Sequence, residues 1–463
     1  MMIGPLILIA VPLAAAMLTF VLRPWRTVTA LVAALALLAA AVWALQTPLD
    51  ELQIVLGRTI VLSSGDRIGI AFLFVVSAAI FVGARLASPG WSYYSIALLI
   101  VAALAAALII RPPLNEIYPS FAYSALCLAI ASALCVFPLQ GERPGVTGGA
   151  LRFITLITLA LPALLLADWS LGQLTQSPDS LVLAEATVRL VMLGFALLLA
   201  VVPFHAWVPI VAGEAPPLST TLVLNVLFGA VWILLLDVMN ENALIGNDPR
   251  VLESLRTAGL LMAAFGGLLT WAQHELGRLL GYAALADTGA ILFAVGTGSS
   301  AGLASALVLV IGRAAGIGLM SIGMAMVRER QKDDSFAALT GLVWKLPWAS
   351  LAVVAGGLSL SGVPPLASFA GRWGVAQQAA GIDPRAAALL LAAGVSVAVG
   401  VLRGLREILS PLPQTDPPVA RERRREVILI VAALALCLFV GLFPGAFSPF
   451  VREFVAAFPS VGR

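Results

Sequence analysis

Six residues that can carry or exchange charge lie inside or beside long apolar runs of this sequence. They are Arg152, His205, Glu214, Asp287, Arg313 and Arg372. A charged side chain at the centre of a bilayer costs about 2.5–3.5 kcal/mol on insertion scales, so such residues are candidates for an ion path. Arg313 is the clearest case, because it lies alone in an uncharged run. An ion pair between Arg313 and Asp287 that joins two helices is an equally good interpretation.

Other kinds of chemistry find little support. His205 is better explained by a hydrogen-bonded packing role than by proton transfer, and the only other histidine, His274, is remote in sequence. The three cysteines lie in apolar runs and form no Cys-x-x-Cys pair. Phosphate-binding loops, nucleophile elbows and dinucleotide fingerprints are missing. We therefore expect no metal, no cofactor and no catalytic residue in this chain.

The composition indicates whether the segments that carry these residues lie in water or in a lipid bilayer. Of 463 residues, 61% are apolar and 11% are charged, and the mean hydropathy is +1.03. Soluble proteins are roughly half apolar and a quarter charged. At about 20 apolar residues per membrane helix, the chain has material for about fourteen spans and little else, so we expect one membrane domain over 1–463. The net charge of +3 is not gathered into a basic face, which excludes nucleic acid as a partner.

Apolar windows of helical length recur along the whole chain, and no alternating strand pattern is present. The windows are 2–22, 27–46, 67–87, 92–111, 118–138, 150–172, 186–211, 217–238, 251–272, 280–298, 301–327, 346–371, 384–409 and 427–451. The fold class predicted is therefore an all-α integral membrane protein with about fourteen transmembrane helices. We divide it into three N-terminal helices (1–90), two five-helix units (91–240 and 250–410) and a C-terminal helix (426–452).

Basic residues predict the orientation, because lysine and arginine near helix ends remain on the cytoplasmic side. Sixteen of them follow odd-numbered helices and ten follow even-numbered ones. This bias places both termini outside the cytoplasm, with the apolar start of the chain retained as a helix. The densest basic run, Arg421 to Glu426, is expected to anchor the chain to lipid headgroups.

Two windows are interrupted in the same manner, which predicts an internal repeat. The seventh is broken at Pro203 and Pro209, and the twelfth at Gly362, Pro364 and Pro365. Pro203 and Pro364 are 161 residues apart, as are Arg152 and Arg313. Because five is odd, a second five-helix copy enters the membrane upside down. Broken helices at matching places in inverted halves are typical of ion and substrate paths.

Several motifs resemble one known family. The main one is Val202-Pro203-Phe204-His205-Ala206-Trp207-Val208-Pro209, followed by Gly213-Glu214-Ala215-Pro216-Pro217-Leu218-Ser219. Others are Gly65 to Ile70, Gly277 to Ala286 and Leu358 to Ala367. The chain thus resembles the antiporter-like membrane subunits of respiratory complex I, Mrp cation/proton antiporters and membrane-bound hydrogenases, and is most similar to the shorter N- or M-type subunits. The resemblance implies a bacterial inner-membrane location, other membrane subunits of a redox or antiporter complex as partners, and a part in proton translocation.

The chain departs from the family pattern where the resemblance would place proton-carrying residues. Similar subunits have lysines where this sequence has Leu198 and, in the eighth helix, Leu227, and the fifth window, 118–138, holds no glutamate. Arginine replaces lysine elsewhere, and arginine stays protonated in proteins. Several hypotheses therefore remain: a translocating subunit, a degenerate scaffold that keeps the fold, a cation/proton antiporter subunit, and a free-standing secondary transporter for a small solute.

Overall fold

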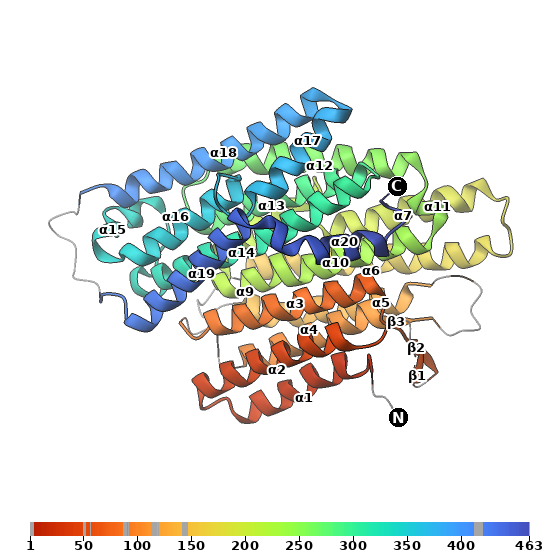
Figure 1. Ribbon diagram of the computed structural model, residues 1–463, viewed down its shortest axis with the longest axis horizontal. Helices are drawn as coiled ribbons and strands as arrows, with labels where there is room; N and C mark the ends of the chain where they lie inside the picture. The colour runs from red at the N-terminus through yellow and green to blue at the C-terminus, as the bar shows by residue number, and fades with distance from the viewer. Residues whose placement is uncertain are drawn as a thin grey trace.

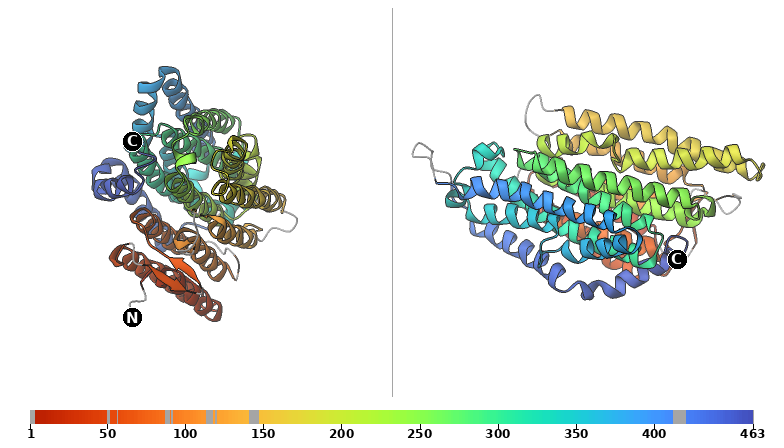
Figure 2. Two further views of the ribbon diagram at one scale, coloured as in Figure 1. Left: turned by 90° about the vertical axis from the view of Figure 1, so that its right-hand side faces the viewer. Right: turned by 90° about the horizontal axis from the view of Figure 1, so that it is seen from above.

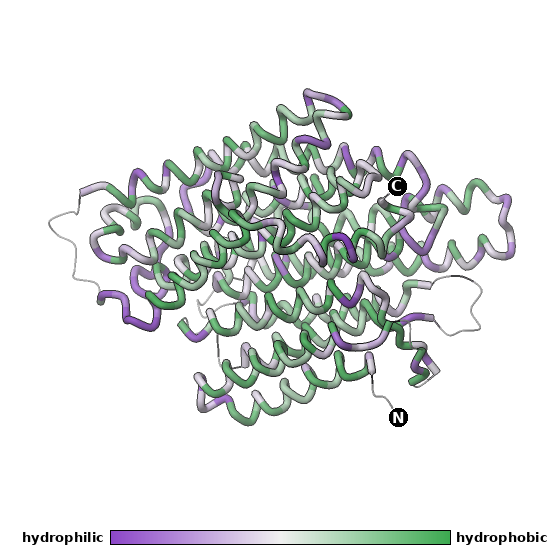
Figure 3. The backbone as a smooth tube through the Cα atoms, in the orientation of Figure 1, coloured by the Kyte–Doolittle hydropathy of each residue, from purple (hydrophilic) through white to green (hydrophobic). Residues whose placement is uncertain are grey.

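The protein is an integral membrane protein built almost entirely of helices (Figure 1). The computed structural model describes residues 4–49, 52–55, 57–86, 90, 92–112, 118, 120–140, 147–411 and 420–462. In these ranges eleven helices are long and apolar enough to cross a membrane, and three apolar helices are shorter. The prediction of a helical membrane protein is confirmed at this level. Figure 3 shows hydrophilic residues gathered near the helix ends, with hydrophobic stretches between them.

The first half of the chain forms seven membrane helices before the first of the two predicted helix breaks. They are α1 (Ile7–Val21), α2 (Arg26–Gln46), α3 (Ser64–Gly83), α4 (Tyr93–Ile109), α5 (Ala122–Leu139), α6 (Gly148–Leu174) and α7 (Leu181–Leu198). A small antiparallel sheet, absent from our prediction, joins β1 (Gln53–Val55), β2 (Arg58–Ile60) and β3 (Ile110–Arg111) in that order. Ile54 pairs with Thr59, and Ile60 pairs with Ile110. Strands of two or three residues are too short to show alternation in a sequence.

The first predicted break lies where α7 ends. Ala200 adopts a left-handed conformation (φ 53°), a cis bond joins Val202 to Pro203, and a short turn η1 (Phe204–Ala206) leads into α8 (Trp207–Glu214). Pro209 does not break the helix, contrary to the prediction. It occupies the third position of α8, where the missing N–H of proline would have no partner within the helix in any case.

The second break has the same layout. Helix α16 (Pro347–Ser361) ends at Gly362, whose φ of 82° favours glycine, and the irregular stretch contains both Pro364 and Pro365. The chain then resumes as α17 (Phe369–Ile382), which ends eleven residues beyond the window predicted at 346–371. Alanine and glutamine have high helix propensity, so α17 continues although its apolar pattern is weak there.

A third irregularity was not predicted. The window 217–238 is α9 (Pro217–Thr221), a π-helical turn η2 (Leu222–Leu227) and α10 (Phe228–Glu241). Every residue of this segment from Pro217 to Met239 is buried. Single π-helical turns are common at functional sites. They leave no signature in hydropathy, because the apolar period scarcely changes over one turn.

The second half is arranged around two central helices. Besides α16 and α17, it contains α11 (Ala243–Gly246), α12 (Pro249–Trp271), α13 (Leu276–Gly296), α14 (Ser300–Gln331), η3 (Phe336–Leu339), α15 (Leu342–Lys345) and α18 (Pro384–Leu409). Figures 1 and 2 show α13 and α14 in the interior, with α1 and α2 at one edge and α17 and α18 at the other. Helix α12 lies very close to α13: a Cβ at Gly266 would be 2.5 Å from the Ala286 nitrogen.

The C-terminal segment differs from the single helix expected over 426–452. Helix α19 (Arg424–Leu442) ends before Pro444, a short turn η4 (Pro444–Phe447) follows, and α20 (Ser448–Ala457) is a separate helix. Helix α20 packs against α3 and α14. Glu453 pairs with Arg67, and the rings of Phe454 and Trp232 stack with centroids 5.5 Å apart. Pro444 lacks the N–H that a continuing helix needs, which accounts for the division.

Candidate functional site

The second break brings a buried ion pair to the middle of the membrane domain. Asp287 lies near the middle of α13 and is fully buried. Arg372 lies in the first turn of α17, directly after the break, and its Nη2 is 2.7 Å from Asp287 Oδ1. The irregular stretch between α16 and α17 thus positions the arginine against the carboxylate. Asp287 is paired with Arg372 rather than with Arg313, the partner that we had considered.

Arg313 lies nearby on α14 and is only 5% exposed. Its guanidinium carbon is 5.5 Å from the ring centroid of Phe228, a cation–π distance. Nε and Nη2 have no hydrogen-bond partner in the described protein. Arg313 also lines a cavity of about 20 Å³ together with Asn225 and Thr288. A polar cavity of that size has room for about one water molecule.

A larger cavity adjoins the ion pair on the side of the second break. It measures about 180 Å³ and is lined by Arg372, Ser361, Gly362 and Trp373, among others. Ser361 uses its hydroxyl within its own helix, donating to the carbonyl of Leu358. The guanidinium of Arg372 therefore lies between Asp287 on one side and open volume on the other.

Several buried hydroxyl groups in the described chain have no protein hydrogen-bond partner. Ser219 and Thr220 lie on α9, and each hydroxyl is unpaired within the described protein. Ser321 on α14 and Ser368 at the second break are unpaired too, and sequence reasoning missed both. Buried polar groups of this kind are usually hydrogen-bonded. These four are where ordered water would be most favourable.

The other three candidate residues lie away from this centre. His205 is half-buried in η1, with its ring centroid 6.3 Å from that of Phe265. Glu214 accepts a hydrogen bond of 2.7 Å from the backbone N–H of Gly149, so it caps the start of α6. Arg152 is exposed on that same helix. Only Asp287, Arg313 and Arg372 of the six are brought together.

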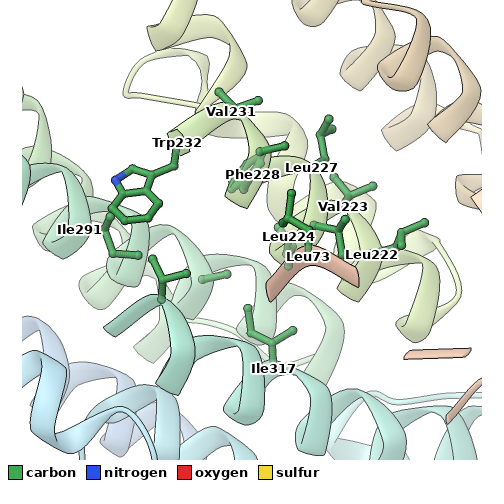
Figure 4. Packing of buried hydrophobic residues seen from close by; sticks show 14 of the residues in the cluster. Leu73, Leu222, Val223, Leu224, Leu227, Phe228, Val231, Trp232, Ile291 and Ile317 are labelled. Carbon is green, nitrogen blue, oxygen red and sulfur yellow. The ribbon is translucent and has the colours of Figure 1, made fainter. Parts of the chain in front are cut away.

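The first half has apolar side chains where the resemblance implied lysines. Leu198, at the end of α7, is 3% exposed, and Leu227, in the π-helical turn, is 1% exposed. Figure 4 shows Leu227 in a cluster with other leucine, valine and aromatic side chains of η2 and α10. The first half thus has no ionisable side chain at these two positions, whereas the second half buries Asp287 and Arg313.

Two further polar networks were not anticipated. Arg328 on α14 donates to the carbonyls of Ala212, Gly213 and Ala215, and pairs with Asp334 at 2.7 Å. It thus fastens the second half to the end of α8. The sequence did not predict this contact, because Arg328 lies near the end of α14 and Asp334 only six residues later, where both could have faced solvent.

The second network lies where β3 meets α3 and α10. The guanidinium of Arg111 is 2.9 Å from Asp66, 3.6 Å from Asp237 and 3.0 Å from Glu241. Asp66 alone belonged to a motif that we had noted. No group of three metal-binding side chains occurs in the part of the chain that the structure describes.

Comparison with known proteins adds independent information. Residues 149–399 match the family described as NADH:quinone oxidoreductase/Mrp antiporter, TM, which is more than half of the chain. NADH-quinone oxidoreductase subunit N of Cereibacter sphaeroides is 30% identical over 328 residues, 67% of this chain and 69% of that protein. This chain belongs to the NADH:quinone oxidoreductase/Mrp antiporter family.

Other members of the family give the same result. NADH-quinone oxidoreductase subunit N 2 of Acidobacterium capsulatum is 30% identical over 292 residues. That match spans 59% of this chain and 58% of the relative, a little over half of each. Among solved structures, a chain of the Mrp complex from Dietzia sp. superimposes with a TM-score of 0.86 at 16% identity, covering 99% of this chain and 98% of the other. The fold is therefore shared along the whole length.

Proposed function

We propose that this chain is a membrane subunit of a redox-driven, ion-translocating complex of the NADH:quinone oxidoreductase type, and that it contributes to proton translocation. Relatives about 30% identical to this chain are subunits N of that oxidoreductase, which supports the proposal. Its partners are then other membrane subunits. It lies in a bacterial cell membrane with both termini outside the cytoplasm, as the distribution of arginine and lysine supports.

The observation that carries the proposal is the Asp287–Arg372 pair with Arg313 beside it. Three ionisable groups buried near the middle of membrane helices are costly, and in membrane proteins they mark ion pathways. The two adjoining cavities, of about 20 and 180 Å³, supply room for water. A purely structural subunit has no need of this combination.

We also propose fourteen transmembrane segments arranged as two inverted five-helix units. The eleven long helices and three shorter apolar ones supply that number in the described chain. The two interrupted helices support the repeat, because each is the fourth member of its unit and resumes after a proline-containing stretch. Inverted units of this type are frequent among transporters, where irregular backbone lines the path.

Within this centre Asp287 is the group that exchanges a proton. Arginine keeps its proton, so Arg313 and Arg372 act as fixed positive charges beside the Asp287 carboxylate. When Arg372 swings into the neighbouring cavity, the carboxylate loses its closest counter-charge and takes up a proton. Movement of partner subunits during redox chemistry would drive that swing, and its reversal would release the proton.

The alternative is a scaffold subunit that has kept the fold and lost its own proton path. The buried leucines at 198 and 227 favour it for the first half. A cation/proton antiporter subunit is the other alternative, and the fold shared with the Mrp complex favours it. All three functions predict partner subunits, but they differ in the need for Arg313 and for an electron donor.

The test isolates the host complex through a tag on this chain and identifies its subunits. Proton uptake is then compared between the Arg313→Met and Arg152→Met variants in membrane vesicles that contain the complex. We expect redox subunits to co-purify. Arg313→Met should lower proton uptake per electron severalfold, whereas the exposed Arg152→Met should leave it unchanged. Equal uptake in both variants would support the scaffold. Ion exchange without an electron donor would support the antiporter.

A further inference from the structure

Five arginines surround a cavity between helices that are distant in sequence. The cavity measures about 630 Å³ and lies where α19 begins, next to the end of α3 and the end of α14. We call it the arginine pocket. Its basic residues are Arg85, Arg330, Arg421, Arg423 and Arg425. All three elements reach this end of the molecule in Figure 1. It is also the end that the basic residues assign to the cytoplasm.

The arginine pocket carries more positive charge than its own carboxylates can balance. Among the residues that the structure describes, Glu329 and Glu426 are the only acidic ones that line it beside the five arginines. Glu426 is already engaged: it accepts hydrogen bonds from Arg330 Nη2 at 2.5 Å and from the backbone N–H of Arg423 at 2.7 Å. The Nη1 atom of Arg330 is buried and has no hydrogen-bond partner. An anion would satisfy that nitrogen and the exposed guanidinium groups around it.

The remaining wall of the pocket is apolar. Val82 and Leu86 line it from the α3 side, and Ile428, Leu429 and Ala432 from α19. Ile428 is 67% exposed, and exposed apolar residues continue along α19 at Val431, Leu436 and Phe439. Figure 3 shows this change from a hydrophilic start to a hydrophobic remainder of α19. The cationic mouth therefore leads onto a surface that faces hydrocarbon.

We propose that the arginine pocket binds an anionic phospholipid. The phosphate would contact the arginines, and an acyl chain would follow the apolar face of α19. A small free anion would use the mouth but gain nothing from the apolar wall, and an acidic peptide would not continue into hydrocarbon. Basic pockets between membrane helices at the cytoplasmic face are well suited to anionic headgroups. This inference is independent of whether the chain conducts protons.

The bound lipid would fill the space between α19 and the N-terminal helices. Helix α19 packs mainly against α14 and α16. The stretch before it is held by Glu422, which accepts a hydrogen bond of 2.7 Å from the backbone N–H of Ala349. On its other side α19 faces α2 and α3 across the arginine pocket. A lipid there would join α19 to the N-terminal helices.

The experiment measures lipid retention on the full-length chain by native mass spectrometry. The probes are dioleoylphosphatidylglycerol and dioleoylphosphatidylcholine, which share acyl chains and differ in net charge. We expect the chain to retain the anionic lipid at least about tenfold better. The triple variant R421Q/R423Q/R425Q should abolish that preference. The control variant R189Q/R250Q/R385Q removes three exposed arginines elsewhere and should retain it.

Three results would overturn the proposal. One is equal retention of the two lipids by the unaltered chain, a measurement that does not depend on any variant folding. Another is displacement of the anionic lipid by millimolar inorganic phosphate, which would indicate a site for free anions. The third is density for a neighbouring subunit's side chains in the arginine pocket of the intact complex, which would make it a protein interface.

Discussion

One carboxylate and two arginines share the centre of the second half, and this imbalance governs how the site responds to substitution. Asp287 is fully buried and its partner Arg372 nearly so. Removing one member of a buried pair leaves an uncompensated charge, whereas replacing both with apolar residues is often neutral. The stability of the pair can therefore be separated from its function.

Arg372→Met should destabilise the chain by about 3–5 kcal/mol, because it removes the closest counter-charge of the buried Asp287 carboxylate. Adding Asp287→Leu should recover most of that loss. Unfolding of the two single variants and the double variant in detergent, followed by circular dichroism, gives the coupling energy. Additive effects of the two substitutions would show that the side chains do not interact.

Glu214 is expected to act as a cap and not as a proton carrier. Glu214→Ala removes the acceptor at the start of α6 and should cost about 1 kcal/mol. Glu214→Gln should cost less, because an amide oxygen can still accept the hydrogen bond from Gly149. Thermal unfolding measures both. A loss of proton pumping in Glu214→Gln at unchanged stability would place this residue on the ion path after all.

Sequence alone indicated the charged residues but not how they pair. A charge in an apolar window is conspicuous, so Asp287 and Arg313 were found readily. That Asp287 pairs with Arg372 depends on the course of the chain through the second break, and no spacing rule describes such a stretch. Ser321 and Ser368 were missed because serine is common in membrane helices and only burial without a partner distinguishes them.

At the scale of elements, two helices approach so closely that their backbones touch. The added methyl group in Gly266→Ala would lie 2.5 Å from the nitrogen of Ala286 and 2.8 Å from the oxygen of Tyr282. Backbone atoms cannot move aside, so α12 and α13 must separate, at a cost of about 1–3 kcal/mol. Because α13 carries Asp287, we expect activity to fall with stability.

Gly318→Ala is the matched control for that substitution. Gly318 lies in the middle of α14, and a methyl group added there would have no other atom within 4 Å, so alanine should be neutral or slightly stabilising. Unfolding temperatures of the two variants test the comparison. Equal effects would mean that close helix packing does not explain the glycine at 266.

Arg328 connects the two halves, and its substitution should lower the stability of both. Arg328→Gln leaves Asp334 buried without its counter-charge and three carbonyls of the α8–α9 turn unbonded, which should cost about 3–5 kcal/mol. Arg278→Gln, which breaks an exposed pair with Glu275, should cost under about 1 kcal/mol. Limited proteolysis and thermal unfolding compare them, and equal stability would argue against the connection.

Elements were predicted well wherever hydropathy or proline signals them. Both interruptions were placed correctly at Pro203 and Gly362, since proline and glycine end helices for local reasons. The π-helical turn at 222–227 and the small sheet at β1–β3 were missed. Their geometry is set by neighbouring helices and by strand pairing over long separations, which a single window of sequence does not contain.

For the whole molecule, the main feature is the difference between its halves. The first half buries leucine at 198 and 227, and the second buries Asp287, Arg313 and Arg372 next to cavities. Apolar windows of helical length predict the fold, but they do not distinguish the two halves, because the difference depends on a few side chains. The central claim is that any proton moved by this chain passes through the second half.

The most direct measurement is the number of protons translocated per electron by the intact complex with Asp287→Leu and Arg372→Met combined. This double variant is expected to fold and assemble, so electron transfer can be followed alongside proton uptake in vesicles. We predict a lower proton-to-electron ratio than in the unaltered complex at equal subunit content. An unchanged ratio in the assembled double variant would contradict the account.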